Sequence, residues 1–105
     1  MIKTILKAAG LLFWQGRASD PPAETYAVYF DDVTADGPDG YNRIFTHDVT
    51  VELYEPRQDD DAEAAIEAEL NARGIPWTKQ ARYWLDDVRR YQVIYEFSYI
   101  EKRRT

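Results

Sequence analysis

The only histidine of the chain, His47, is the first residue to consider for acid–base chemistry, and it stands next to Asp48. An imidazole acts as a general base near neutral pH when a nucleophile lies within hydrogen-bond reach. No Ser or Cys motif with the form of a nucleophile elbow accompanies His47. Its spacing predicts that it shares one strand face with Phe45 and Val49. We therefore expect a structural histidine with satisfied hydrogen bonds.

Three groups of aspartates suggest a site for a hard cation, because calcium and magnesium bind carboxylate oxygens. They are Asp31 with Asp32, Asp59 to Asp61, and Asp86 with Asp87. None has the spacing of a calcium loop, and each fits a local structural role: a strand end, a helix start and a turn. The sequence also contains no P-loop, dinucleotide fingerprint or paired-histidine helix. We expect no cofactor, no metal and no catalytic residue.

The size of the chain predicts one domain over residues 1–105, with a single core. Hydrophobic residues make up 45% of it, and it contains no cysteine, so neither disorder nor a disulfide framework is expected. A formal net charge of -6 argues against specific nucleic-acid binding, which depends on clustered Lys and Arg. The late basic residues are interpreted as solvated strand ends; they are Arg89, Arg90, Lys102, Arg103 and Arg104.

The first fourteen residues contain two lysines in an apolar stretch, so a signal peptide and an amphipathic helix are both considered. The helix is favoured because Ile2, Ile5, Leu6 and Ala9 recur at helical spacing and Gly10 is placed to end it. No stretch approaches the length of a membrane span, so no membrane association is expected.

The middle of the chain predicts a long β-hairpin followed by a helix. A short strand over "LLFW" and a loop containing Pro21 and Pro22 come first. The segments "TYAVYFDDVTADG" and "YNRIFTHDVTVELYE" alternate as strands, with a tip near residues 37–40. The segment "EPRQDDDAEAAIEAELNARG" has apolar residues at helical spacing and predicts a helix. Asp60 and Glu63 are at capping-box spacing, and Glu63 is predicted to lie away from the apolar stripe.

The last third predicts a strand over "IPWTKQARYWL", a turn over "DDVRR" and a final strand over "RYQVIYEFSYIEKRR". Odd residues 91–99 of the final strand form an aromatic face that suits the core, with Tyr91 and Tyr99 partly exposed at its ends. The even face carries Ile94 and Ile100 among polar residues. We expect an α+β domain with an antiparallel, or mixed, sheet of four to five strands and two helices on one face, in the order α-β-β-β-α-β-β.

Aromatic residues are too numerous for one small core, with three tryptophans and eight tyrosines in 105 residues. Such residues are enriched at the centres of protein interfaces. Together with the lack of a catalytic motif, this indicates assembly into a larger structure. The candidate subunit or partner contacts are Trp14, Asp36, Asp39, Trp77, Trp84, Ile94 and Ile100.

Five segments that span almost the whole chain carry a resemblance to a known family: "TYAVYFDDV", "HDVTVELYEP", "DAEAAIEAELNARGI", "KQARYWL" and "YQVIYEFSYIEK". They resemble small proteins of phage and prophage tail modules, similar to the tail terminator, tail-completion or minor tail proteins of long-tailed phages. The resemblance implies a structural virion protein that forms a hexameric ring at the head-proximal end of the tail tube. The ring stops tube growth and joins the head's connector, DNA passes through it, and assembly takes place in the host cytoplasm.

Three alternatives remain open from the sequence. A head-completion or stopper protein would act at the same junction. An acidic phage-encoded inhibitor that mimics the charge of DNA would use the balance of 19 acidic against 13 basic residues. A small metal-dependent hydrolase would need the dispersed aspartates to meet in space.

Overall fold

Two long alternating segments form the central hairpin of the sheet, as the sequence predicts. In the computed structural model, which describes residues 1–37 and 42–104, β2 (Tyr26–Asp36) pairs antiparallel with β3 (Asn42–Glu55). The other edge of β3 pairs antiparallel with β6 (Arg90–Arg104) along its whole length. The predicted tip at 37–40, which includes Asp39, lies outside the described residues except for Gly37.

Three short strands complete a six-stranded sheet in the order β1-β2-β3-β6-β4, with β5 also beside β6. β1 (Leu12–Gln15) runs parallel to the start of β2, which makes the sheet mixed. β4 (Trp77–Lys79) and β5 (Tyr83–Leu85) both pair antiparallel with β6. The strand predicted over residues 75–85 is thus two strands, because the three residues 80–82 oppose only two residues of β6 and interrupt the regular pairing. Arg82 of this segment pairs with the Glu63 carboxylate.

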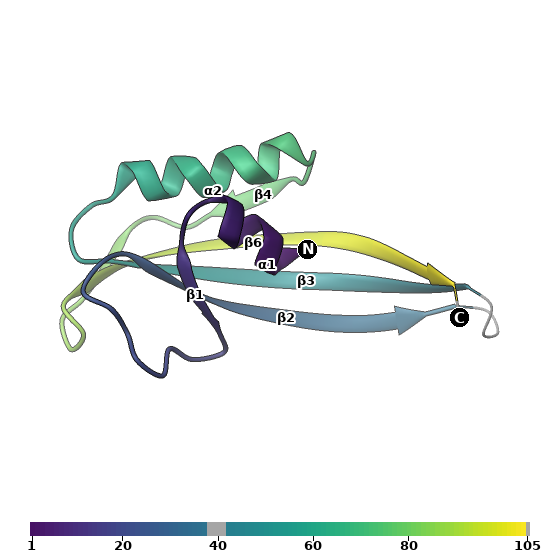
Figure 1. Cartoon of the computed structure of the whole chain (residues 1–105), viewed down its shortest axis with the longest axis horizontal. Helices are drawn as coiled ribbons and strands as arrows, with labels where there is room; N and C mark the ends of the chain where they lie inside the picture. The colour runs from purple at the N-terminus through teal and green to yellow at the C-terminus, as the bar shows by residue number, and fades with distance from the viewer. Residues whose placement is uncertain (38–41, 105) are drawn as a thin grey trace.

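Both helices, α1 (Ile2–Ala8) and α2 (Asp60–Ala72), lie on one face of the sheet (Figure 1). Gly10 ends the first helical segment with a φ of 76°, which glycine adopts without strain. Asp59 caps α2 by accepting a hydrogen bond from the Ala62 N–H, so the cap lies one residue before the predicted capping box. The expected α+β class and element order are confirmed, with six strands in place of the predicted four to five because one predicted strand is divided into β4 and β5.

The core lies between the helices and the odd-numbered face of β3 and β6. Tyr95, Phe97, Val49 and Val51 are buried there, as predicted. Ile66 and Leu70 of α2 and three residues of α1 pack over them as one cluster; the α1 residues are Ile2, Ile5 and Leu6. Tyr91 and Tyr99, at the ends of the aromatic face, are half-buried as expected.

The far parts of β2, β3 and β6 project beyond both helices as a three-stranded ribbon (Figure 1). We call this ribbon the arm and define it as residues 30–36, 42–48 and 98–104; the rest of the domain is the body. The molecule is therefore elongated, with extents of 49 × 27 × 21 Å. Val33 and Ile100 of the arm are 46% and 62% exposed, since no helix covers them.

Candidate functional site

His47 lies at the base of the arm and connects all three of its strands. Its Nδ1 is 2.9 Å from Oδ2 of Asp31 on β2, and its Nε2 is 2.8 Å from Oε1 of Glu101 on β6. The imidazole stacks on the Tyr99 ring, with the ring centroids 4.4 Å apart. The residue is 7% exposed. The face shared with Phe45 and Val49 is the predicted one, and both ring nitrogens have partners.

Burial alone would lower the pKa of His47, but the hydrogen bonds and negative charges of Asp31 and Glu101 outweigh it and raise the pKa above 6.5. The hydrogen bond from Arg103, followed by that from His47, lowers the pKa of Glu101 to about 2. An imidazolium between two carboxylates has no free ring nitrogen with which to accept a proton. This geometry supports a clamp that joins three strands and provides no general base.

A second charge cluster lies beneath α2 and was missed by the sequence analysis. Glu63, predicted to lie away from the apolar stripe, is only 5% exposed. Its two carboxylate oxygens lie 2.8 Å from Nζ of Lys79 and 2.7 Å from Nη2 of Arg82. Lys79 also pairs with Glu67, and Arg82 with Asp60. The cluster ties α2 to β4 and to the segment that links β4 with β5.

Glu55, at the end of β3, is fully buried beside this cluster. Its pKa is raised to about 7, chiefly by burial and then by the hydrogen bond with the neighbouring Glu63 carboxylate. The pKa of Glu63 is lowered, because hydrogen bonds from Glu55, Lys79 and Arg82 outweigh its own burial. Oε2 of Glu55 has no partner that donates to it. A proton on Glu55 resolves this, since the protonated carboxyl can donate to Glu63.

The positions of these two glutamates are visible in the sequence once the right spacing is used. Glu63 precedes Ile66 by three residues and Leu70 by seven, which places it on the apolar stripe of α2. Glu55 continues the odd-numbered series of Val51 and Leu53. Both residues could therefore have been predicted as buried, whereas their cationic partners come from a part of the chain that no local pattern connects to them.

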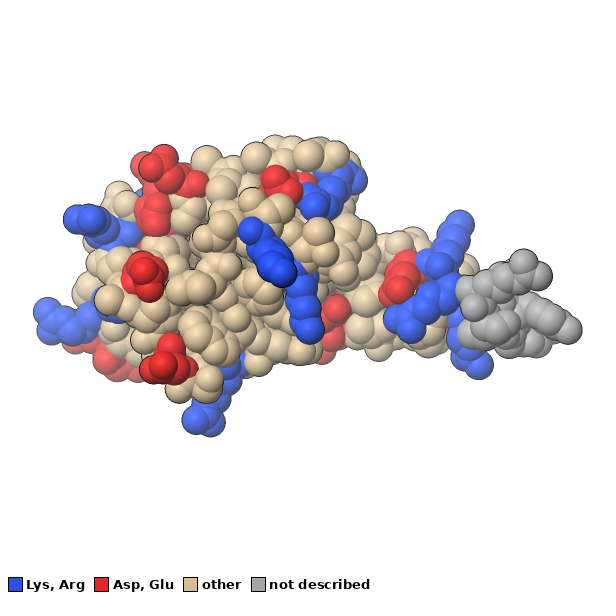
Figure 2. Space-filling model, in the orientation of Figure 1, with Lys and Arg blue, Asp and Glu red and all other residues tan. Residues whose placement is uncertain are grey.

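The arm has two strand edges without a partner among the described strands. β1 pairs with β2 only as far as Tyr29, which leaves residues 30–36 of β2 as a free edge. β4 pairs with β6 only as far as Phe97, which leaves residues 98–104 as a second free edge on the opposite side. Free edges present backbone donors and acceptors that can pair with another chain. Lys and Arg gather near the end of the arm (Figure 2).

The predicted contact residues fall into separate groups. Asp36 and Ile100 are exposed on the arm, on the sheet face opposite the helices. Trp14 and the half-buried Ile94 belong to one cross-strand row of that same face, on the body. Asp39 lies outside the described residues. The structure does not gather the candidates into one patch.

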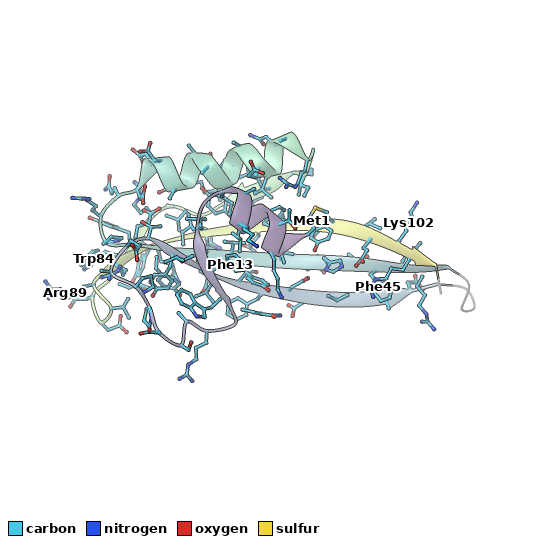
Figure 3. The ribbon with its side chains drawn as sticks, in the orientation of Figure 1. Met1, Phe13, Phe45, Trp84, Arg89 and Lys102 are labelled. Atoms are coloured by element: carbon cyan, nitrogen blue, oxygen red, sulfur yellow. The ribbon has the colours of Figure 1, made fainter. Side chains whose placement is uncertain are left out.

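The three tryptophans each pack against a tyrosine. Trp14 lies edge-on to Tyr26 and Trp77 to Tyr95. Trp77 also donates a hydrogen bond from Nε1 to Asn71 and packs against the core, so it contributes to the fold. Trp84 contacts Tyr91 but is 41% exposed, and it lies at the opposite end of the molecule from Lys102 (Figure 3).

Neither a metal-ligand cluster nor a membrane helix is found among residues 1–37 and 42–104. No group of three His, Cys, Asp or Glu side chains in those ranges is arranged to hold a metal ion. No helix there is long and apolar enough to cross a membrane. The aspartate pairs named above do not converge.

Sequence comparison with known proteins found no relative. No protein-family model matches the chain, and no curated protein sequence matches it. Proposals about function therefore rest on the residues, the geometry and the resemblance described above.

Proposed function

We propose that this chain is a structural subunit of a phage or prophage tail. Copies of it form a ring, hexameric by the resemblance, at the head-proximal end of the tail tube. There the ring ends tube growth and binds the connector of the head. Its partners are further copies of itself, the tube protein and the head-completion protein, and it performs no catalysis.

The observation that carries this proposal is the arm. A three-stranded ribbon that projects beyond its own core gains little stability from burial, because most of its described side chains are exposed and neither outer edge pairs with a described strand. Large exposed apolar side chains on such a ribbon are typical of surfaces that bind another protein. Phe30, Ile44 and Ile100 share the uncovered face of the arm and are 39%, 39% and 62% exposed.

The inhibitor hypothesis receives less support from the same geometry. A DNA mimic needs carboxylates that are free to take the places of phosphates. In the segment "DDDAEAAIEAE", however, Glu63 and Glu67 are paired with Lys79, and Asp60 is paired with Arg82. Those carboxylates stabilise the domain itself. The hydrolase hypothesis likewise lacks a gathered set of ligands in the described ranges.

Sedimentation velocity over a wide concentration range, followed by electron microscopy with purified tail tubes, tests the proposal. The expected result is a species near six subunits, or rings that cap one end of the tubes. Binding to connector-bearing heads but not to tubes would instead favour the head-completion alternative. A protein that forms no ring and binds neither tubes nor heads would refute the proposal.

A further inference from the structure

We propose that neighbouring copies join through the arms, with the free edge of β6 from one copy pairing in parallel with the free edge of β2 from the next. The inference rests on the proposed ring and names the surface that would close it. Each joint would continue the three-stranded ribbon of one copy into that of its neighbour, so the arms together would form one uninterrupted sheet around the ring.

The two free edges differ in charge. Residues 30–36 of β2 include Asp31, Asp32 and Asp36 and no basic residue. Residues 98–104 of β6 contain one acidic residue, Glu101, and three basic residues, Lys102, Arg103 and Arg104. Like charges on both edges would keep copies apart, which is a common defence of edge strands. Opposite charges on opposite edges permit association in one arrangement only, with unlike edges together.

This arrangement is head-to-tail, which is the kind of contact that generates a ring. A two-fold dimer would place one edge against its own copy, acidic against acidic or basic against basic. A head-to-tail joint uses both edges of every copy, and it closes when the rotation returns to the first subunit. The charges therefore select the contact type that the proposed function requires.

The strand directions agree with this geometry. β2 and β6 are each antiparallel to β3, so they run in the same direction, from the body toward the end of the arm (Figure 1). If the ring axis is parallel to the strands, rotation about it leaves the strand direction the same in every copy. β6 of one copy and β2 of the next are then parallel, as a joint between them requires.

The cross-strand rows of the arm identify the side chains that would meet. Asp36 and Lys102 occupy the same row, each beside Ile44 of β3 and on the face away from the helices. Neither takes part in an ion pair among the residues that the structure describes. When the row continues into a neighbouring copy, Asp36 lies beside Lys102 of that copy. In the next row on this face, Thr34 of one copy would lie beside the exposed Ile100 of its neighbour.

Charge exchange in mixed rings tests this contact. Asp36→Lys places lysine against lysine at every joint, and Lys102→Asp places aspartate against aspartate. Each variant alone should need about tenfold or more protein to assemble. In an equimolar mixture the two variants can alternate around an even-numbered ring, and every joint then holds one lysine and one aspartate. Assembly of the mixture should return to the wild-type concentration range.

The controls are Asp20→Lys and Arg17→Asp, which make the same charge changes on exposed residues of the β1–β2 loop. Both should assemble as wild type, and circular dichroism should show the same fold for all four variants. If the wild type assembles and the arm variants assemble equally well, or if mixing them restores nothing, the inferred joint is wrong while the ring proposal stands. If the wild type forms no ring alone or on tubes, both fail together.

Discussion

Replacing Glu63 by Gln should cost more stability than any exposed charge substitution in this domain. The change removes the negative charge that holds Lys79 at 2.8 Å and Arg82 at 2.7 Å, and it brings an amide N–H₂ toward two cations. A hydrogen bond to a charged group contributes about 1.5–3 kcal/mol. The lower value applies because both cations keep a second carboxylate partner, Glu67 or Asp60. The expected loss is about 3 kcal/mol.

Urea unfolding followed by far-UV circular dichroism measures this loss, provided that the m-value stays unchanged. In a thermal melt, about 3 kcal/mol corresponds to a Tm lower by about 12 °C for a domain of this size. The matched control is Glu69→Gln, which removes a surface pair with Arg73 at an i,i+4 spacing. That pair should contribute only about 0.3–0.5 kcal/mol.

A loss in Glu63→Gln no larger than that in Glu69→Gln would refute the interpretation of the cluster as an internal tie. The variant also has a second signature. The Glu63 carboxylate raises the pKa of Glu55. Without that charge the pKa of Glu55 should fall, and a carboxyl titration followed by NMR would detect the change.

Three further predictions concern the core, the His47 clamp and the sheet face opposite the helices. Phe97→Ala should destabilise the domain by about 3–5 kcal/mol in urea unfolding, since Phe97 is only 5% exposed; a loss below 1 kcal/mol would contradict its core position. The raised pKa of His47 contributes stability that is present below pH 6.5 and is lost as pH rises through the raised value. His47→Gln should therefore flatten the dependence of Tm on pH in that range. Identical profiles for the variant and the wild type would show that His47 does not act as a clamp. Ile94→Asp should weaken assembly in sedimentation velocity more than folding, and a variant unfolded as a monomer would show that this face is core.

Periodicity in the sequence was sufficient to predict the elements of the central sheet and its buried face. Alternation in β3 and β6 predicted Val49, Val51, Tyr95 and Phe97 as core because a period of two assigns each residue to one face. The apolar stripe of α2 was predicted through Ile66 and Leu70, but Glu63 was wrongly placed away from it. Such patterns describe one element at a time, however, and contain no information about its neighbours.

The features that were wrong or missed depend on contacts between distant segments. Three aspartates in succession could each have capped α2, and Asp59 does so while it also accepts a hydrogen bond from the Thr25 hydroxyl. The division between β4 and β5 coincides with an extra residue in the segment 80–82, where Arg82 pairs with the distant Glu63. The parallel pairing of β1 with β2 likewise depends on a loop whose path no periodicity records.

The pairing of β3 with β6 also determines when the domain can complete itself. Glu55 pairs with Tyr91 and Asn42 with Arg104, so each pair joins residues from well-separated parts of the chain. Sheets built from such distant pairs fold slowly, because a long loop must close before the contacts form. During synthesis the β2–β3 hairpin therefore cannot complete the central sheet until β6, the last of the described strands, has been made. The basic edge of the arm forms only when β6 pairs with β3, so a copy without β6 would lack one of the two edges through which we propose that copies join.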